Sequence, residues 1–139
     1  MHQASSGSCT CSDIRYRITG PALQVVACHC GMCRRMTGAP FSSYVVVKEA
    51  ELELAAQDEA LASYPVTERT TRHFCRRCGT PIFNANPHTY RGLAMVYLGT
   101  LQGHEALAPG IAIYCENKLP WLSVSESARH FDAAPKRSS

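Results

Sequence analysis

Long apolar runs are absent from this sequence, and none approaches the roughly 18 consecutive apolar residues that indicate a membrane-spanning helix. We therefore expect a soluble protein with no membrane partner. Charge of either sign is also scarce, because charged residues make up 18% of the chain and the formal net charge is +3. So small an excess of positive charge does not call for a polyanionic partner, and we expect no nucleic acid to bind.

A secretory signal is missing as well, since residues 1–7 contain no apolar segment. The 8 cysteines of this chain of 139 residues could form disulfides in a secreted protein, but in a reducing compartment they are better explained as metal ligands or catalytic groups. We therefore expect a cytoplasmic protein. The length predicts a single domain over 1–139, ordered over about 8–132, with a mobile start and a disordered tail from residue 133.

The sequence also lacks the pattern of a long amphipathic helix. Only 57–62 has acceptable helix propensity, and it is short. Strand periodicity or β-branched and aromatic composition recurs instead at 14–18, 23–27, 41–47, 49–54, 69–74, 81–83, 93–98 and 111–115, and 33–37 is expected to form a helical turn that ends at Gly38. Short strands separated by turns predict a mainly β domain with antiparallel sheets.

Cysteine is what the sequence has in abundance, and three cysteines follow the strand expected at 23–27. Cys28, Cys30 and Cys33 cannot all point into an apolar core, because side chains alternate between the faces of an extended segment and Gly31 allows a turn. Zinc binds cysteine sulfur at about 2.3 Å in a tetrahedron, and catalytic sites keep one position open for water or substrate. We therefore expect these three residues to form an incomplete, catalytic zinc site at a hairpin end.

Two further pairs, Cys9 with Cys11 and Cys75 with Cys78, add up to four thiolates from distant segments. The second pair is followed by Gly79, which is typical of a zinc knuckle. Four thiolates would complete a structural zinc site that joins the N-terminal strand to a distant hairpin. Spacing leaves two alternatives open: the triplet could combine with one knuckle cysteine, and the cysteines could form disulfides.

Two arginine pairs accompany the cysteines. Arg34 and Arg35 follow the triplet, and Arg76 and Arg77 lie inside the knuckle. Arginine binds carboxylates through two hydrogen bonds, so Arg34 and Arg35 are candidates to bind a small anionic substrate. An equally good interpretation is a solvated surface that offsets the negative charge of the thiolates.

Three other side chains are assigned from their neighbours. We expect His29 to face away from the metal and to form a hydrogen bond with backbone or substrate, because thiolates already crowd the site. We expect Cys115 to be a buried free thiol on a strand, and Trp121 to pack in the core.

The three cysteine motifs, in this order, resemble a known family. The segment 27–40, reading ACHCGMCRRMTGAP, and the segment 74–83, reading FCRRCGTPIF, are similar to motifs of the glutathione-dependent formaldehyde-activating enzymes (GFA). Segments 7–11 and 14–16 resemble the family's opening, and 99–101, Pro109 and 118–121 resemble its C-terminal part. The resemblance implies a zinc-stapled β-tent (Mss-four-like) fold.

The resemblance also implies a function. It implies two zinc ions per chain, a structural one on Cys9, Cys11, Cys75 and Cys78 and a catalytic one on Cys28, Cys30 and Cys33. It further implies a carbon–sulfur lyase, in which glutathione adds to formaldehyde or another small aldehyde. An under-coordinated zinc would bind the glutathione sulfur and lower its pKa.

Three residues depart from the family pattern. Ser12 stands where the family usually has glycine, Gln102 where aspartate often follows Leu101, and Ala112 where histidine is common. None of them is a proposed zinc ligand, but they weaken any transfer of substrate identity. Two other interpretations stay open: a non-catalytic zinc module that binds a protein partner, and redox chemistry in which 28–33 cycles to a disulfide.

Overall fold

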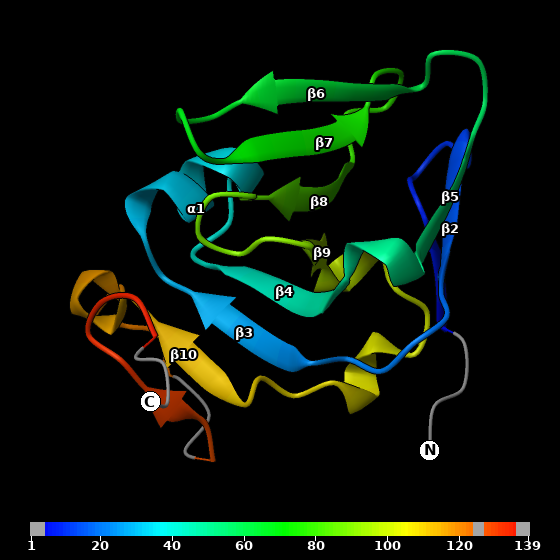
Figure 1. The fold of residues 1–139 in the computed structure, drawn as a ribbon. Helices are drawn as coiled ribbons and strands as arrows, with labels where there is room; N and C mark the ends of the chain where they lie inside the picture. The colour runs from blue at the N-terminus through cyan, green and yellow to red at the C-terminus, as the bar shows by residue number, and fades with distance from the viewer. Residues whose placement is uncertain (1–4, 124–126, 136–139) are drawn as a thin grey trace.

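The computed structural model describes residues 5–123 and 127–135, and this part of the chain forms two β-sheets and one α-helix (Figure 1). The strands are β1 (Ser5–Ser8), β2 (Ile14–Ile18), β3 (Gln24–Cys28), β4 (Ser42–Lys48), β5 (Leu52–Ala56), β6 (Leu61–Pro65), β7 (Thr71–Cys75), β8 (Pro81–Ala85), β9 (Leu93–Tyr97), β10 (Ile111–Ile113) and β11 (Arg129–His130). The helix α1 spans Gly31–Thr37, and 3-10 turns cover Glu49–Glu51, Leu98–Thr100, His104–Ala106 and Cys115–Asn117.

The large sheet has the strand order β11-β10-β3-β4-β9-β8-β7-β6. Its strands are antiparallel to their neighbours except β10, which runs parallel to β3 and β11. The antiparallel neighbours β3 and β4 are joined by the loop that contains His29 and Cys30, followed by α1. Figure 1 shows α1 and the small sheet, in the order β1-β2-β5, on opposite sides of the large sheet.

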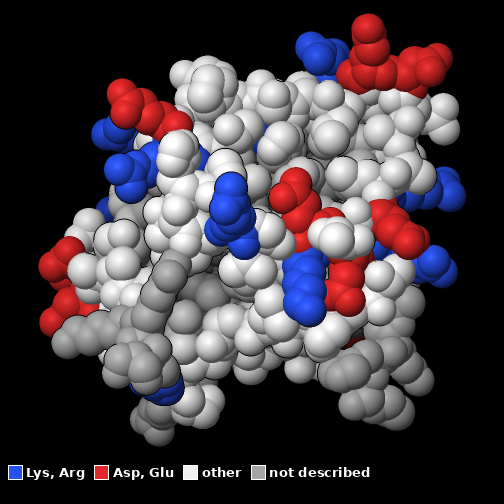
Figure 2. Space-filling model, viewed as in Figure 1, with Lys and Arg blue, Asp and Glu red and all other residues white. Residues whose placement is uncertain are grey.

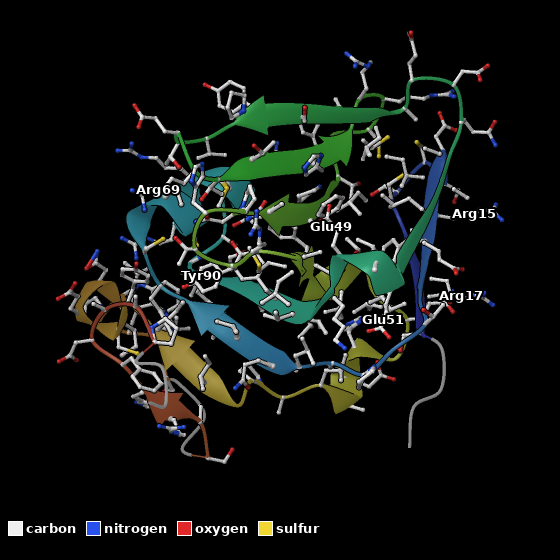
Figure 3. The ribbon with its side chains drawn as sticks, in the orientation of Figure 1. Arg15, Arg17, Glu49, Glu51, Arg69 and Tyr90 are labelled. Carbon is white, nitrogen blue, oxygen red and sulfur yellow. The ribbon has the colours of Figure 1, made fainter. Side chains whose placement is uncertain are left out.

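Strand β2 shows why the small sheet packs as it does. Its sequence, IRYRI, alternates apolar and charged residues, and Ile14, Tyr16 and Ile18 are buried whereas Arg15 and Arg17 are exposed. The two arginines point outward from the sheet in Figure 3. A strand with one apolar face has to cover it, and this face closes over the large sheet.

Strand β4 separates two layers of side chains. Val45 and Val47 face the small sheet and form the main core with Val96 of β9. Tyr44 points to the opposite face, where it lies beside Tyr97 of β9 at 5.0 Å between ring centroids. Because β4 buries residues on both faces, its Tyr-Val-Val-Val run reads as continuously apolar rather than alternating.

The expectation of a mainly β domain is confirmed. Strands β2, β3, β4, β5, β7, β8, β9 and β10 each overlap a segment that the sequence predicts to be extended. The helical turn expected at 33–37 is also present, as the second part of α1. The helix ends where predicted, because Gly38 adopts a left-handed conformation with φ 73° and its N–H binds the Arg34 carbonyl.

Several boundaries were predicted wrongly. At residues 57–62, where the sequence pattern predicted neither a helix nor a strand, Leu61 begins β6 and pairs with β7. The strand expected over 111–115 ends at Ile113, because Tyr114 has a left-handed φ of 55°. At the start of the chain, Ser5–Ser8 is not mobile but pairs with β2 as β1.

The tail expected to be disordered from residue 133 is ordered at its start. The Tyr114 N–H donates a hydrogen bond to the Ala133 carbonyl at 3.0 Å. Residues 136–139, and residues 1–4 of the predicted mobile start, lie outside the described part of the chain.

Charges are interspersed on the surface. On the face drawn in Figure 2, Lys and Arg side chains lie among Asp and Glu. Arg17 and Glu53 form an ion pair at 3.0 Å. Within the described ranges, no helix is both long and apolar enough to cross a membrane.

Candidate metal centres

The structure gathers Cys9, Cys11, Cys75 and Cys78 into one cluster, with all sulfur atoms within 4.8 Å of one another. The first two lie in the turn between β1 and β2, and the others lie at the end of β7 and in the turn before β8. The Cys11 sulfur is 3.6 Å from that of Cys9 and 3.7 Å from that of Cys75. This cluster links the small sheet to the large one.

Backbone N–H groups point at the sulfurs of this cluster. The Cys9 sulfur accepts from the Ile14 N–H at 3.3 Å, and the Cys75 sulfur accepts from the Cys78 N–H at 3.4 Å. The Thr80 hydroxyl lies 3.2 Å from the Cys78 sulfur and lowers the pKa of that thiol to about 5. These donors favour thiolates, which are the form that binds metals.

The second cluster contains Cys28, Cys30 and Cys33, whose sulfurs also lie within 4.8 Å of one another. Cys28 ends β3, Cys30 caps the N-terminus of α1, and Cys33 lies in its first turn. The cap is the Cys30 sulfur itself, which accepts a hydrogen bond from the Cys33 N–H at 3.2 Å. No knuckle cysteine joins this group among the described residues, so the triplet stands apart.

The three thiols of the triplet differ in acidity. The Cys33 sulfur donates to Cys28 at 2.9 Å, and Cys28 donates to Cys30 at 3.6 Å. Hydrogen bonds with Cys28 and Cys33 lower the pKa of Cys30 to about 2, whereas hydrogen bonds with Cys30 and Cys33 raise the pKa of Cys28. Cys30 is therefore the thiol of the triplet that most readily becomes a thiolate.

A chain of hydrogen bonds between buried polar side chains ends at the Cys33 sulfur. The Tyr97 hydroxyl donates to Asn84 Oδ1 at 3.0 Å, Asn84 Nδ2 donates to the Tyr44 hydroxyl at 3.4 Å, and Tyr44 donates to the Cys33 sulfur at 3.3 Å. Burial raises the pKa of Tyr44, so its phenol stays protonated and remains a donor. No sequence motif points to Tyr44, Asn84 or Tyr97, because strand pairing alone brings them to the cysteine loop.

The donor sets fit zinc. A tetrahedron with sulfurs at about 2.3 Å from zinc has edges of about 3.8 Å. The separations of 3.6 and 3.7 Å in the four-cysteine cluster, and 3.6 Å between Cys28 and Cys30, match that edge, whereas the 2.9 Å between Cys28 and Cys33 is shorter than it. Four thiolates make a closed set, whereas three leave one position for another ligand.

A cavity of about 340 Å³ opens beside the triplet. Its walls come from one face of the large sheet and from α1, and they include all three cysteines with Tyr44 and Tyr90. Figure 3 labels Tyr90, which lies on the β8–β9 connection near α1. The second cluster therefore faces a cavity, which the four-cysteine cluster does not line.

The two arginines that follow the triplet differ in their contacts. Arg34 Nη1 donates to the backbone oxygens of His29 at 2.6 Å and Asn117 at 2.8 Å, and so ties the cysteine loop to the C-terminal segment. Arg35 borders an open hollow of about 670 Å³, together with Arg72 of β7. The sequence analysis missed Arg72, whose guanidinium stacks over Phe74 and whose buried Nε has no hydrogen-bond partner among the described residues.

The knuckle arginines make structural contacts. Arg76 Nε donates to the Glu59 carbonyl at 3.0 Å, and Arg77 pairs with Asp13 at 3.3 Å. Both contacts join the knuckle to neighbouring turns. They fit the interpretation of Arg76 and Arg77 as part of a solvated surface.

Other side chains differ from expectation in instructive ways. His29 is 1% exposed and stacks on Phe41, and neither ring nitrogen has a hydrogen-bond partner among the described residues, so the expected hydrogen bond to backbone is wrong. Burial is the main cause that lowers the pKa of His29, and repulsion from the positive charges of Lys118 and Arg34 lowers it further. The expected strand position of Cys115 is also wrong: it begins a 3-10 turn and is only partly buried.

Trp121 was expected in the core and is instead 67% exposed. It follows Pro120 in a turn, outside the strands that supply the core, so its apolar character was a poor guide to its position. None of the 8 cysteines, all of which lie in the described ranges, forms a disulfide.

Comparison with known proteins agrees with this arrangement of cysteines. The family model described as glutathione-dependent formaldehyde-activating enzyme matches residues 4–117, which include both clusters. The chain belongs to the GFA family. The sequence resemblance is thereby confirmed, and a GFA domain occupies most of the chain.

Individual relatives are more distant. An uncharacterized lyase of Schizosaccharomyces pombe is 25% identical over 57% of this chain and 56% of its own length. A protein of Aspergillus flavus, provisionally named a glutathione-dependent formaldehyde-activating enzyme, is 30% identical over 64% of this chain and 48% of its own length. This chain thus spans about half the length of these curated relatives.

A solved structure shares the fold. The crystal structure of a Rhodobacter sphaeroides protein superposes with a TM-score of 0.56 and 20% identity, over 70% of this chain and 88% of the other. At this identity the likeness concerns the fold.

Proposed function

We propose that this GFA domain is a zinc-dependent carbon–sulfur lyase that forms or cleaves the adduct of glutathione, or a similar thiol, with formaldehyde or another small aldehyde. The observation that best supports this function is the incomplete triplet Cys28, Cys30 and Cys33, which faces a cavity while a complete four-cysteine cluster lies elsewhere. A purely structural module needs only the complete cluster.

Each cluster has its own role in this proposal. Cys9, Cys11, Cys75 and Cys78 hold a structural zinc ion, and Cys28, Cys30 and Cys33 hold a catalytic one. A zinc ion held by the triplet would act as a Lewis acid and would lower the pKa of a thiol bound to it.

The chain's own residues then position the reaction. The hydrogen bond from Tyr44 fixes the Cys33 sulfur, and Asn84 and Tyr97 hold Tyr44 in the orientation that donates. The walls of the cavity exclude bulk water from the aldehyde, which limits hydration of its carbonyl.

Glutathione is an anion with two carboxylates, and the hollow beside α1 is lined by arginine side chains that can bind a carboxylate. We assign Arg35, with Arg72, to a glutathione carboxylate, because both line this hollow next to the triplet. Arg34 contributes positive charge and holds the cysteine loop through its backbone contacts. A cytoplasmic location fits a glutathione-dependent activity and 8 unpaired cysteines.

The decisive experiment compares two cysteine variants. Cys30→Ser in the triplet should abolish glutathione-dependent turnover of formaldehyde, with unchanged circular dichroism. Cys115→Ser, the same change outside both clusters, should keep the rate. Zinc and free thiols are counted in both proteins before and after a mild chelator.

The counts separate the alternatives. Two zinc ions per chain, one of them released readily with three thiols, support the lyase. A Cys30→Ser protein with the wild-type rate would refute the mechanism and leave a non-catalytic zinc module, whereas a reversible disulfide within 28–33 of the metal-free protein would favour redox chemistry.

A further inference from the structure

The cavity beside the triplet is built mainly from apolar side chains. One face of the large sheet supplies Val26 of β3, Val46 of β4 and Met95 of β9, and β10 supplies Ile111 and Ile113. These positions face the same side because β3 Val26 pairs with Tyr44, Val46 with Met95, and Ile111 with Val26. Aliphatic side chains that surround a space without closing it can gain free energy from an apolar ligand.

The size of the cavity exceeds what formaldehyde requires. The hydroxymethyl group of its adduct has two heavy atoms, and a water molecule takes a share of about 30 Å³ in the liquid. The cavity measures about 340 Å³. A hydroxymethyl group would leave most of this volume to water against apolar walls, whereas a group of about six to eight carbons, at about 30 Å³ each, would occupy roughly half to two thirds of it.

The lack of charged side chains around the cavity indicates that the charged glutathione peptide does not occupy it. None of the described residues that line the cavity is Asp, Glu, Lys, Arg or His. The adjoining hollow, which shares Met32 and Met36 with the cavity, contains Arg35 and Arg72. The charged peptide therefore has a place outside, and the group attached to its sulfur has a place inside.

We propose that the aldehyde carries an apolar group of hexyl or phenyl size, which binds in this cavity while the glutathione peptide lies in the arginine hollow. This inference rests on the proposed function. In the addition, the thiol S–H bond breaks, a sulfur–carbon bond forms, and the carbonyl π pair becomes an O–H bond with the released proton. The reverse step restores thiol and aldehyde, and neither direction needs an oxidant.

Binding of unreactive analogues tests the cavity directly. S-hexylglutathione and S-methylglutathione share the peptide and differ by methylenes, so their affinities for the zinc-loaded protein are measured by calorimetry. Burial is worth roughly a fourfold gain per methylene, and we expect the hexyl compound to bind at least about tenfold more tightly. Equal affinities would overturn the inference.

A matched pair of variants locates the effect. Val46→Phe fills the cavity from β4 and should remove most of the hexyl preference. Val25→Phe makes the same change on β3 at a position whose side chain points to the other face, since Val25 pairs with Val45, and it should keep the preference. A preference that survives Val46→Phe would place the hexyl group elsewhere and contradict the proposal.

Turnover measurements distinguish the inference of an apolar substrate from the proposed lyase function on which it rests. With glutathione, hexanal should show a higher kcat/KM than formaldehyde. Formaldehyde turnover without a hexyl preference would overturn the apolar substrate and keep the lyase. A hexyl preference without turnover of either aldehyde would overturn the lyase and keep the cavity as the site of an apolar S-substituent.

Discussion

Ser12 offers a test of the local geometry around the four-cysteine cluster. It has a left-handed φ of 66° in the turn that follows Cys11, and its N–H binds the Cys9 carbonyl at 3.2 Å. The family usually has glycine at this position. A side chain in this conformation costs about 1 to 2 kcal/mol relative to glycine, so Ser12→Gly should stabilise the folded protein.

The expected gain is smaller than the full strain. Glycine also loses more backbone freedom on folding, which takes back roughly 0.5 to 1 kcal/mol. The net increase in the free energy of unfolding is therefore about 0.5 to 1 kcal/mol, which raises Tm by about 2 to 4 °C in a chain of this size. Urea unfolding of the zinc-loaded proteins, under equal zinc, measures it.

Two glycine variants serve as controls for this prediction. Gly38→Ser puts a side chain at a φ of 73° and should destabilise the protein by about 1 kcal/mol, whereas Gly99→Ser, at a position without positive φ or close neighbours, should not. Equal or lower stability of Ser12→Gly would refute the claim that the turn at Ser12 is strained.

Three further predictions concern the metal sites and the core. Cys75→Ser removes a proposed zinc ligand that is fully buried in the cluster between the sheets and should unfold the domain or strongly lower Tm, and a soluble variant with unchanged Tm would contradict the proposed structural role. Tyr44→Phe removes the hydrogen bond to Cys33 and should weaken zinc binding at the triplet about tenfold, measured by chelator competition, with the other zinc unaffected. Burial raises the pKa of Tyr16 from 10 to about 12, so the folded state favours the neutral phenol; its contribution to stability is complete below pH 10 and is lost as pH rises from 10 towards 12. Tyr16→Phe should flatten this alkaline decline in urea unfolding, and an unchanged decline would assign it to another group.

The sequence by itself determined the fold class and the grouping of the chemistry. The alternation of Ile14, Tyr16 and Ile18 with arginines predicts β2, because a strand with one buried face has a period of two residues. The cysteine spacings predict three short motifs with neighbouring sulfurs, because each motif places two or three sulfurs on one short turn. These are local properties, and local geometry follows from neighbouring residues.

Local rules failed where a distant segment decided the conformation. The composition of residues 57–62 left their conformation open, and pairing of Leu61 with β7 decided it, whereas Trp121 is apolar and yet lies exposed in a turn. The sequence also could not decide which of the cysteine groups would combine, since that depends on how the sheets pack.

Only the tertiary structure determined what surrounds the triplet. The hydrogen bonds from Tyr97 through Asn84 and Tyr44 to Cys33 join three strands, and the cavity combines one face of the large sheet with α1. Such contacts arise from strand register across the sheet, which no single segment specifies. The sequence therefore predicted the cysteine motifs, and packing of the strands decided which cluster faces an apolar cavity and which lies between the sheets.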